Sequence, residues 1–190
     1  MSAGRQRVWL TCLVGFGLWT AQACAGDLSA LPEFNRLDIG AAISGDALGT
    51  GNKAGAMQSG RNNVADIGQT GGLGNNAQLW QQGSDLRAEI SQIGAGNLIR
   101  LNQDGSLSQA TLVQNGMDNL MLISQVGVGA SVNGLQVGDG NSVLLLQRND
   151  TSFGFTQIGN QNQISVELPN GMGLHVDQIG NNLSYKVSPN

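Results

Sequence analysis

The sequence has 190 residues, of which 12% are charged and only 4% are aromatic, and it contains 29 glycines and 3 prolines. This length suits a single domain, and a hydrophobic content of 40% argues against simple disorder provided that the apolar residues follow a pattern. The 9 Lys and Arg residues are fewer than the 13 Asp and Glu residues and form no cluster, so the composition argues against a nucleic-acid partner.

Residues 1–25 have the features of a secretory signal peptide: two arginines, an apolar run too short to span a membrane, and Ala-x-Ala cleavage sites. We expect cleavage after Ala25, with Ala23 as the alternative. Cys24 lies in a poor version of a lipoprotein motif, and lipid attachment there would anchor the protein. Cleavage after Ala25 would remove both cysteines, so the exported chain would have no disulfide.

The next segment, residues 26–46, differs in pattern from the rest of the chain. It lacks the periodicity described below and includes Pro32. These features suit a linker or an export-targeting segment that precedes the repeats.

A repeat extends from residue 47 to residue 190. Its clearest feature is a Gln that recurs every 11 residues, with one interval of 12 and two shorter ones of 10. Leu168 takes the one later place at which Gln is missing. The glutamines of the series are Gln58, Gln69, Gln81, Gln92, Gln103, Gln114, Gln125, Gln136, Gln147, Gln157 and Gln178.

Two other residue types share this spacing. A Gly follows two residues after most of the glutamines, and the glycines that we assign to tight turns are Gly60, Gly94, Gly116, Gly138 and Gly159. An Asn recurs six residues before the next Gln, at Asn63, Asn75, Asn97, Asn119, Asn141 and Asn162. From Asn75 onward Asn occupies alternate units only. The full repeat is therefore about 22 residues long and consists of two similar arms.

Each arm alternates strictly between two faces. Asn97, Ile99, Leu101 and Gln103, for example, all share one parity. A period of two predicts a half-buried strand, whereas a helix would need apolar residues three and four positions apart. Two strands and two turns per repeat predict an all-β fold: a cross-β solenoid with strand-turn-strand coils and two stacked parallel sheets. Residues 47–190 have room for six to seven coils, stacked about 4.8 Å apart.

Buried Gln and Asn side chains are costly unless their amides are paired. Stacked in register, each amide can donate to the same amide one coil away, as in the Asn and Gln ladders of cross-β assemblies. We therefore predict that the Gln and Asn series form such ladders and template further chains. The alternative, solvated residues at strand ends, does not explain why Gln shares the parity of the apolar residues.

The outward positions differ between the two predicted sheets. On the sheet formed by the Asn-bearing arms several of them are large and apolar, and a row of such residues suggests lateral contact with a partner or a membrane surface. The residues of this predicted lateral face are Trp80, Leu98, Leu120, Leu122, Leu144 and Leu146.

The stretch from Gln58 to Gln69, QSGRNNVADIGQ, reads Gln-x-Gly-x-x-Asn-x-Ala and ends in Gln. It resembles the repeat of the curlin family, which forms curli, the extracellular functional amyloid of bacteria. Residues 74–105 and 144–157 look closer to the minor subunit of that family, the fibre nucleator, than to the major one. The resemblance extends from about residue 47 to the C-terminus.

The resemblance implies a structural protein that passes through the periplasm and the outer-membrane curli pore, with its accessory factors, to the cell surface. Its implied partner is the major curlin subunit, which it would template into fibres that serve adhesion and biofilm formation. The outer-membrane surface is a further expected contact. The region around Leu168 departs from the repeat, and it offers only Arg148 and Lys186 for the basic contacts that the family's last repeat is thought to make.

Two other functions stay open at this point: the major, fibre-forming subunit and a secreted β-solenoid adhesin. An enzyme is not expected, because acid–base catalysis needs convergent carboxylates or a partnered His, and the sole histidine, His175, falls on the predicted outer face. A calcium-binding repeat would need Gly-Gly-x-Gly-x-Asp in series, and residues 71–76 match it once, without the Asp. We therefore predict no catalytic residue, metal or cofactor.

Overall fold

The computed structural model describes residues 45–46 and 51–188, and their regular structure consists of strands alone. The strands are β1 (Gly45–Asp46), β2 (Lys53–Arg61), β3 (Val64–Thr70), β4 (Asn76–Ser84), β5 (Arg87–Ala95), β6 (Leu98–Ser106), β7 (Gln109–Met117), β8 (Leu120–Val128), β9 (Ser131–Val137), β10 (Ser142–Gln147), β11 (Ser152–Ile158), β12 (Gln163–Leu168), β13 (Gly173–Ile179) and β14 (Ser184–Val187). The predicted signal peptide and most of the predicted linker lie outside the described residues. Within the described part, no helix has the length and hydropathy of a membrane span.

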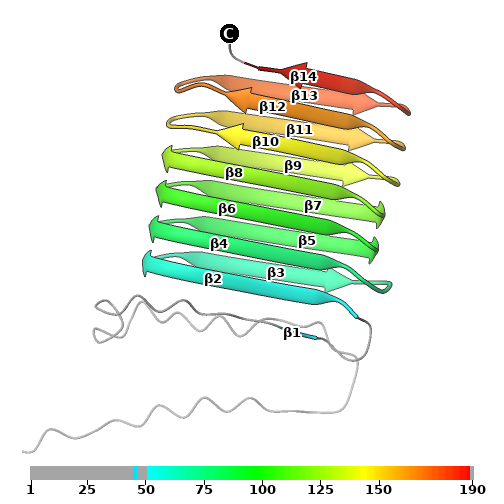
Figure 1. The fold of residues 1–190 in the computed structure, drawn as a ribbon, viewed down its shortest axis with the longest axis horizontal. Coiled ribbons are helices and arrows are strands. Elements are labelled where there is room, and N and C mark those ends of the chain that lie inside the picture. The colour runs from blue at the N-terminus through cyan, green and yellow to red at the C-terminus, as the bar shows by residue number, and fades with distance from the viewer. Residues whose placement is uncertain (1–44, 47–50, 189–190) are drawn as a thin grey trace, which may run out of the picture.

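The strands form two sheets that lie face to face (Figure 1). The first sheet has the order β1-β2-β4-β6-β8-β10-β12-β14, and the second has the order β13-β11-β9-β7-β5-β3. Every neighbouring pair is parallel except β1 and β2. The chain alternates between the sheets, so two strands and two turns make one coil. The predicted all-β solenoid, with a repeat of about 22 residues and about six turns, is confirmed.

The turns between the strands differ in length, and these differences account for the irregular spacing of the glutamines. Successive hydrogen-bonded glutamines are 23 residues apart at Gln58 and Gln81, 22 apart in the middle of the chain, and 21 apart at Gln136 and Gln157. The strands remain in register throughout, so that Gln faces Gln in each sheet. Equivalent side chains therefore form straight columns along the axis of the solenoid.

The core consists of the inward columns of the two sheets, filled mainly by Ala, Ile, Leu and Val. Residue sizes in one column compensate each other. Gly134 lies next to Phe155 in the second sheet, and a Cβ added to Gly134 would lie 2.2 Å from the Phe155 ring. The ring thus occupies the space that the glycine leaves, which maintains the close packing that protein interiors require.

Several turns are made by a single residue in the left-handed region. Asn62, Asp85, Asp118 and Asp150 have φ values of 55 to 57°, and these small polar residues tolerate that conformation. Leu107 adopts it as well, with φ 57°. The tight turns keep each coil short, and they position the Gln and Asn side chains at the strand ends.

Candidate functional site

The glutamines of the first sheet form one continuous series of amide hydrogen bonds. Each side-chain Nε2 donates to the Oε1 of the glutamine one coil further towards the C-terminus. The pairs and distances are Gln58 to Gln81 (2.6 Å), Gln81 to Gln103 (2.8 Å), Gln103 to Gln125 (2.8 Å) and Gln125 to Gln147 (3.1 Å). The series ends at Leu168, which is fully buried in the next coil and pairs with Gln147 in the sheet.

The second sheet contains a parallel series that runs to the last coil. The pairs are Gln69 to Gln92 (2.7 Å), Gln92 to Gln114 (2.9 Å), Gln114 to Gln136 (2.9 Å), Gln136 to Gln157 (2.7 Å) and Gln157 to Gln178 (2.8 Å). The glutamines of these two series from Gln81 to Gln157 are at most 1% exposed, whereas Gln58 and Gln69 in the first coil are half-buried. We call the two series the Gln ladders.

The second amide hydrogen of most ladder glutamines bonds the two sheets together. Gln103 Nε2, in the first sheet, also donates to the carbonyl oxygen of Arg87 in the second sheet, at 3.1 Å. Gln114 Nε2 donates in the opposite sense to Leu98 O at 3.3 Å. A backbone carbonyl can only accept a hydrogen bond, so these contacts define which side-chain atom is the nitrogen and hence the direction of each ladder.

The asparagines before the strands of the first sheet form a third column, the Asn ladder. It contains Asn52, Asn75, Asn97, Asn119, Asn141 and Asn162. Asn97 is typical: its backbone N–H and its Nδ2 both donate to Asn75 Oδ1, at 3.1 and 3.0 Å, and Nδ2 also donates to Gly116 O at 2.9 Å. These side chains cap the turns, and the bonds from one Asn to the next donate towards the N-terminus, opposite to those of the Gln ladders.

Asn63 does not join this column. It precedes β3 in the second sheet, and its Oδ1 accepts from the backbone N–H of Leu86 at 3.2 Å, while its Nδ2 donates to Ser59 O at 3.0 Å and to Gly83 O at 3.2 Å. Its column continues with Leu86 and Ser108, which have no amide. Asn63 is therefore an isolated turn cap.

The glycines that follow the glutamines lie at strand ends, where neighbouring coils approach closely. Gly60, Gly94 and Gly116 are the penultimate residues of β2, β5 and β7, while Gly138 and Gly159 directly follow β9 and β11. All five have φ between 108 and 135°, and a Cβ added to any of them would lie 1.7 to 2.1 Å from the next glycine's carbonyl oxygen. These positions exclude side chains, so Gly is needed there both for its φ and for its lack of a Cβ.

A further set of turn contacts was missed by the sequence analysis. The residue after the glycine accepts a backbone hydrogen bond from the preceding coil: Met117 N donates to Asp139 Oδ1 at 2.8 Å, and Asp139 N donates to Asn160 Oδ1 at 2.9 Å. The recurring Gly-Asp and Gly-Asn pairs were the available signal, because Asx side chains commonly bond nearby backbone groups.

The predicted lateral face divides into two parts. Leu98 pairs with Leu120, and Leu122 with Leu144, on the outer side of β6, β8 and β10, with Leu146 two residues further along β10. These five leucines form a diagonal patch, the leucine patch, of which Leu144 is the most exposed at 55%. Trp80 lies apart, because Asn102 and Ser124 separate it from Leu146 in its column. The expected row is thus a compact patch and a separate tryptophan.

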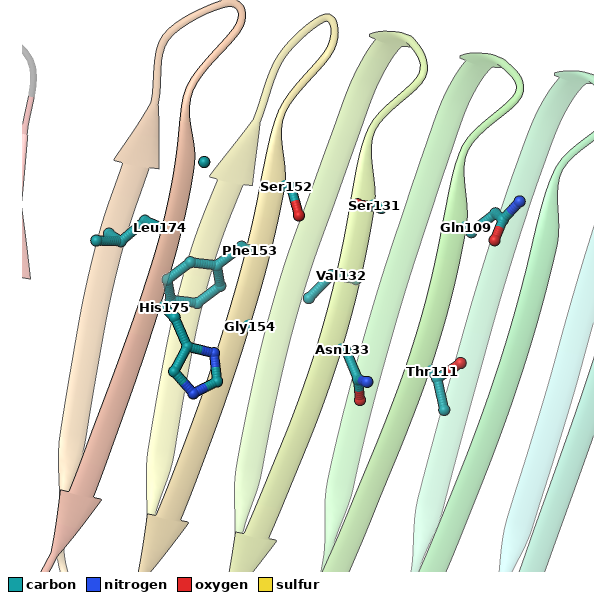
Figure 2. Close-up of a pocket in the computed structure, with 11 residues that line it drawn as sticks. Gln109, Thr111, Ser131, Val132, Asn133, Ser152, Phe153, Gly154, Leu174 and His175 are labelled. Atoms are coloured by element: carbon teal, nitrogen blue, oxygen red, sulfur yellow. The ribbon is translucent and has the colours of Figure 1, made fainter.

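A shallow hollow lies on the outer face of the second sheet, across β7, β9, β11 and β13 (Figure 2). It forms where Gly154 and Gly173 contribute no side chain. His175 lies at its side, with its ring against Gly154 and its Nε2 3.0 Å from Asp177 Oδ1. The His175 side chain is 63% exposed, and residues 45–46 and 51–188 contain no cluster of three metal-ligating side chains. The hollow therefore lacks the desolvated, convergent groups of a catalytic centre.

The search of curated proteins and the search of solved structures each found no match. Residues 94–127 match the family model of the curlin associated repeat. The matched segment covers β6 and β7 and most of β8, including three glutamines of the Gln ladders. Over this segment the chain is similar to the curlin associated repeat.

Proposed function

We propose that this protein is an extracellular, non-enzymatic structural protein that nucleates amyloid fibres of the curli type. The observation that carries the proposal is the set of amide ladders, which run along the axis with one rung per coil. Among the described residues every buried side-chain nitrogen and oxygen has a hydrogen-bond partner. A coil with the same pattern can continue the ladders and both sheets at an end of the solenoid, which is the geometry of templated cross-β growth.

The proposed partner is the major curlin subunit, reached after export through the periplasm and the outer-membrane curli pore with its accessory factors. The resulting fibres would serve adhesion and biofilm formation at the cell surface. The curlin repeat and the β-solenoid support a structural role in preference to catalysis.

A seeding assay tests nucleation. A small molar fraction of the purified protein should remove the lag phase of major-subunit assembly, followed by thioflavin fluorescence, because a preformed end replaces the slow formation of a first coil. A seed unfolded in denaturant and diluted immediately before mixing serves as the control and should shorten the lag less. An unchanged lag with the folded seed would rule out nucleation.

Deleting the gene distinguishes the two curlin subunits. Loss of a nucleator leaves major subunit that is secreted in soluble form, whereas loss of the major subunit leaves no fibre protein. The second result would assign this chain to the major subunit, and fibres that form normally in the deletion strain would favour an independent adhesin.

We assign the leucine patch to retention of the protein at the cell surface, through lateral contact with the outer membrane or with a neighbouring fibre. Replacing Leu120, Leu122, Leu144 and Leu146 with Ser should lower the cell-bound fraction several-fold, because it removes most of the apolar area of the patch. Seeding should stay intact, since these side chains point away from the ladders. The measurement is an immunoblot of cell-bound and released protein.

Val113 and Leu135 provide a matched control for this experiment. They are adjacent outward residues of the second sheet, and both are half-buried. Their replacement by Ser removes apolar surface from the opposite face and should leave retention unchanged. Equal loss of retention in the two variants would contradict the assignment.

A further inference from the structure

The two ends of the solenoid offer different chemistry. The first coil, formed by β2 and β3, makes up the N-terminal end, while β13 and β14 make up the C-terminal end (Figure 1). Because every rung of the Gln ladders donates towards the C-terminus, acceptors remain at the N-terminal end and donors at the other. The ladders thus give the solenoid a direction.

At the N-terminal end, Gln58 and Gln69 use their Nε2 groups to donate into the second coil. No residue among those described donates to the Oε1 atom of either side chain. Both glutamines are half-buried, so a donor that reached these oxygens would form its hydrogen bond partly shielded from water. This end therefore presents two acceptors, one in each sheet, for the side-chain amides of an incoming coil.

Gly60, Gly83 and Gly105 stack in one column of the first sheet, the glycine column, which adds a steric requirement at the same end. A Cβ on Gly60 would lie 1.7 Å from Gly83 O, and a Cβ on Gly83 would lie 1.7 Å from Gly105 O. Each Cβ position in this column points towards the carbonyl of the following coil. By the same geometry, the residue that stacks on Gly60 from outside would direct its Cβ at Gly60 O. An incoming coil must have Gly there.

At the C-terminal end, two of the three ladders have already stopped. Leu168 ends the Gln ladder of the first sheet, and Leu183 ends the Asn ladder by donating its backbone N–H to Asn162 Oδ1 at 3.0 Å. Of the three ladders, only the Gln ladder of the second sheet still has an amide side chain in the last coil. This is Gln178, and its Nε2 donates to Gln163 O at 3.1 Å. An added coil would continue one ladder at this end and two Gln ladders at the other.

The N-terminal edge is partly covered by β1. Gly45 and Asp46 pair antiparallel with Ala54 and Lys53, at the start of β2. The rest of β2, from Gly55, and the whole of β3 pair with no other described strand on that side. Of the strand pairs formed by described residues, an incoming coil would have to displace these two on β2 and none on β3.

We propose that subunit addition takes place on the N-terminal end, and that this end selects a coil with Gln-x-Gly in both of its arms. The glutamines donate to Gln58 and Gln69, and the glycine of the first arm lies over Gly60. The occupant is a different protein and not the C-terminal end of a second copy of this chain, because that end of the solenoid has no second ladder glutamine beyond Leu168. The inference rests on the proposed nucleating function and adds its direction and its selection rule.

Disulfide trapping with a synthetic coil tests the inference. The probe is a peptide with the sequence of residues 97–117, which contains Gln-x-Gly twice. Asn102 belongs to the same outward column as Met57, so an Asn102→Cys peptide stacked in register should bond to a Met57→Cys full-length chain in which Cys12 and Cys24 are replaced with Ser. Cα atoms of neighbouring strands are close enough for a disulfide.

The C-terminal end is probed by a matched pair. Lys186 shares the outward column of Arg100, so a Lys186→Cys chain is tested with an Arg100→Cys peptide. We expect the yield of crosslinked product, measured by mass spectrometry, to be about ten-fold lower at this end, since one buried hydrogen bond fewer is made. Comparable yields at the two ends would overturn the direction that we infer.

Variant peptides test the selection rule. Gln103→Leu and Gly105→Ala peptides should each lose most of the crosslink at Met57→Cys, while an Asp104→Ala peptide, changed at an exposed outward position, should retain it. An undiminished crosslink with the Gly105→Ala peptide would refute the rule. A protein that seeds normally but crosslinks mainly at Lys186→Cys contradicts the inference alone, whereas absence of both seeding and crosslinking contradicts the proposed function as well.

Discussion

Replacing Gly105 with Ala is expected to lower the free energy of unfolding of the solenoid by about 2–6 kcal/mol, through backbone strain and overpacking together. Gly105 has φ 134°, and a Cβ there would lie 1.8 Å from Gly127 O in the next coil. That carbonyl belongs to the stacked backbone and cannot move without separating β6 from β8. The measurement is urea unfolding of the soluble protein, followed by circular dichroism.

Gly171→Ala is the matched control for this variant. Gly171 also has a positive φ, of 73°, but a Cβ there has no heavy atom within 4 Å. Its replacement imposes left-handed strain without obstructing the stacking of coils, so it should cost about 1 kcal/mol. If both variants lost the same stability, backbone conformation and not the approach of neighbouring coils would explain the regular spacing of glycine in this chain.

Replacing Gln114 with Leu is expected to lower the free energy of unfolding by about 2–6 kcal/mol, because the buried side-chain amides of two neighbouring ladder glutamines lose a partner, at about 1–3 kcal/mol each. Gln114 is fully buried, accepts from Gln92 and donates to Gln136. The change tests polarity more than shape, since Leu168 occupies the equivalent column in the first sheet and is also fully buried. Urea unfolding again provides the measurement.

Two comparisons sharpen this prediction. Gln178→Leu, at the end of the same ladder, leaves one ladder glutamine, Gln157, without a side-chain partner where Gln114→Leu leaves two, and it should cost about half as much. The double variant Gln92→Leu with Gln114→Leu should cost less than the sum of the single changes, because the second substitution removes a group that the first left unpaired. Additive losses would mean that the two amides contribute independently and that no coupled ladder exists.

The sequence was sufficient to predict the fold because its period is short and regular. Once Gln recurs every 11 residues and apolar residues alternate between, stacked two-strand coils bring the glutamines into two columns, one in each sheet. Asn63 shows where this reasoning fails: it shares the spacing of the other asparagines, but the identity of its neighbours, Leu86 and Ser108, decides whether a ladder forms. The prediction that Trp80 belongs to the row of leucines fails for a similar reason, since polar residues in the intervening coils separate it from the leucine patch.

Other features needed atomic positions. The motif shows that glutamines are paired, but only the bonds to backbone carbonyls, such as that of Gln103 to Arg87, show which way each amide points. Likewise, a glycine two residues after Gln suggests a turn, whereas Gly60 and Gly94 lie inside strand ends and are needed for the approach of coils. Direction and close approach are properties of stacked coils and do not follow from one repeat.

The constant offset of about 22 residues between paired strands also determines how the chain can fold. Each coil closes a loop of that length, so the entropy cost of loop closure is the same at every step and never involves distant parts of the sequence. Folding can begin at any pair of neighbouring coils and spread by nearest-neighbour contacts, as in other repeat proteins. Growth within the monomer and growth by subunit addition then become the same elementary reaction, differing only in whether the next coil is covalently attached.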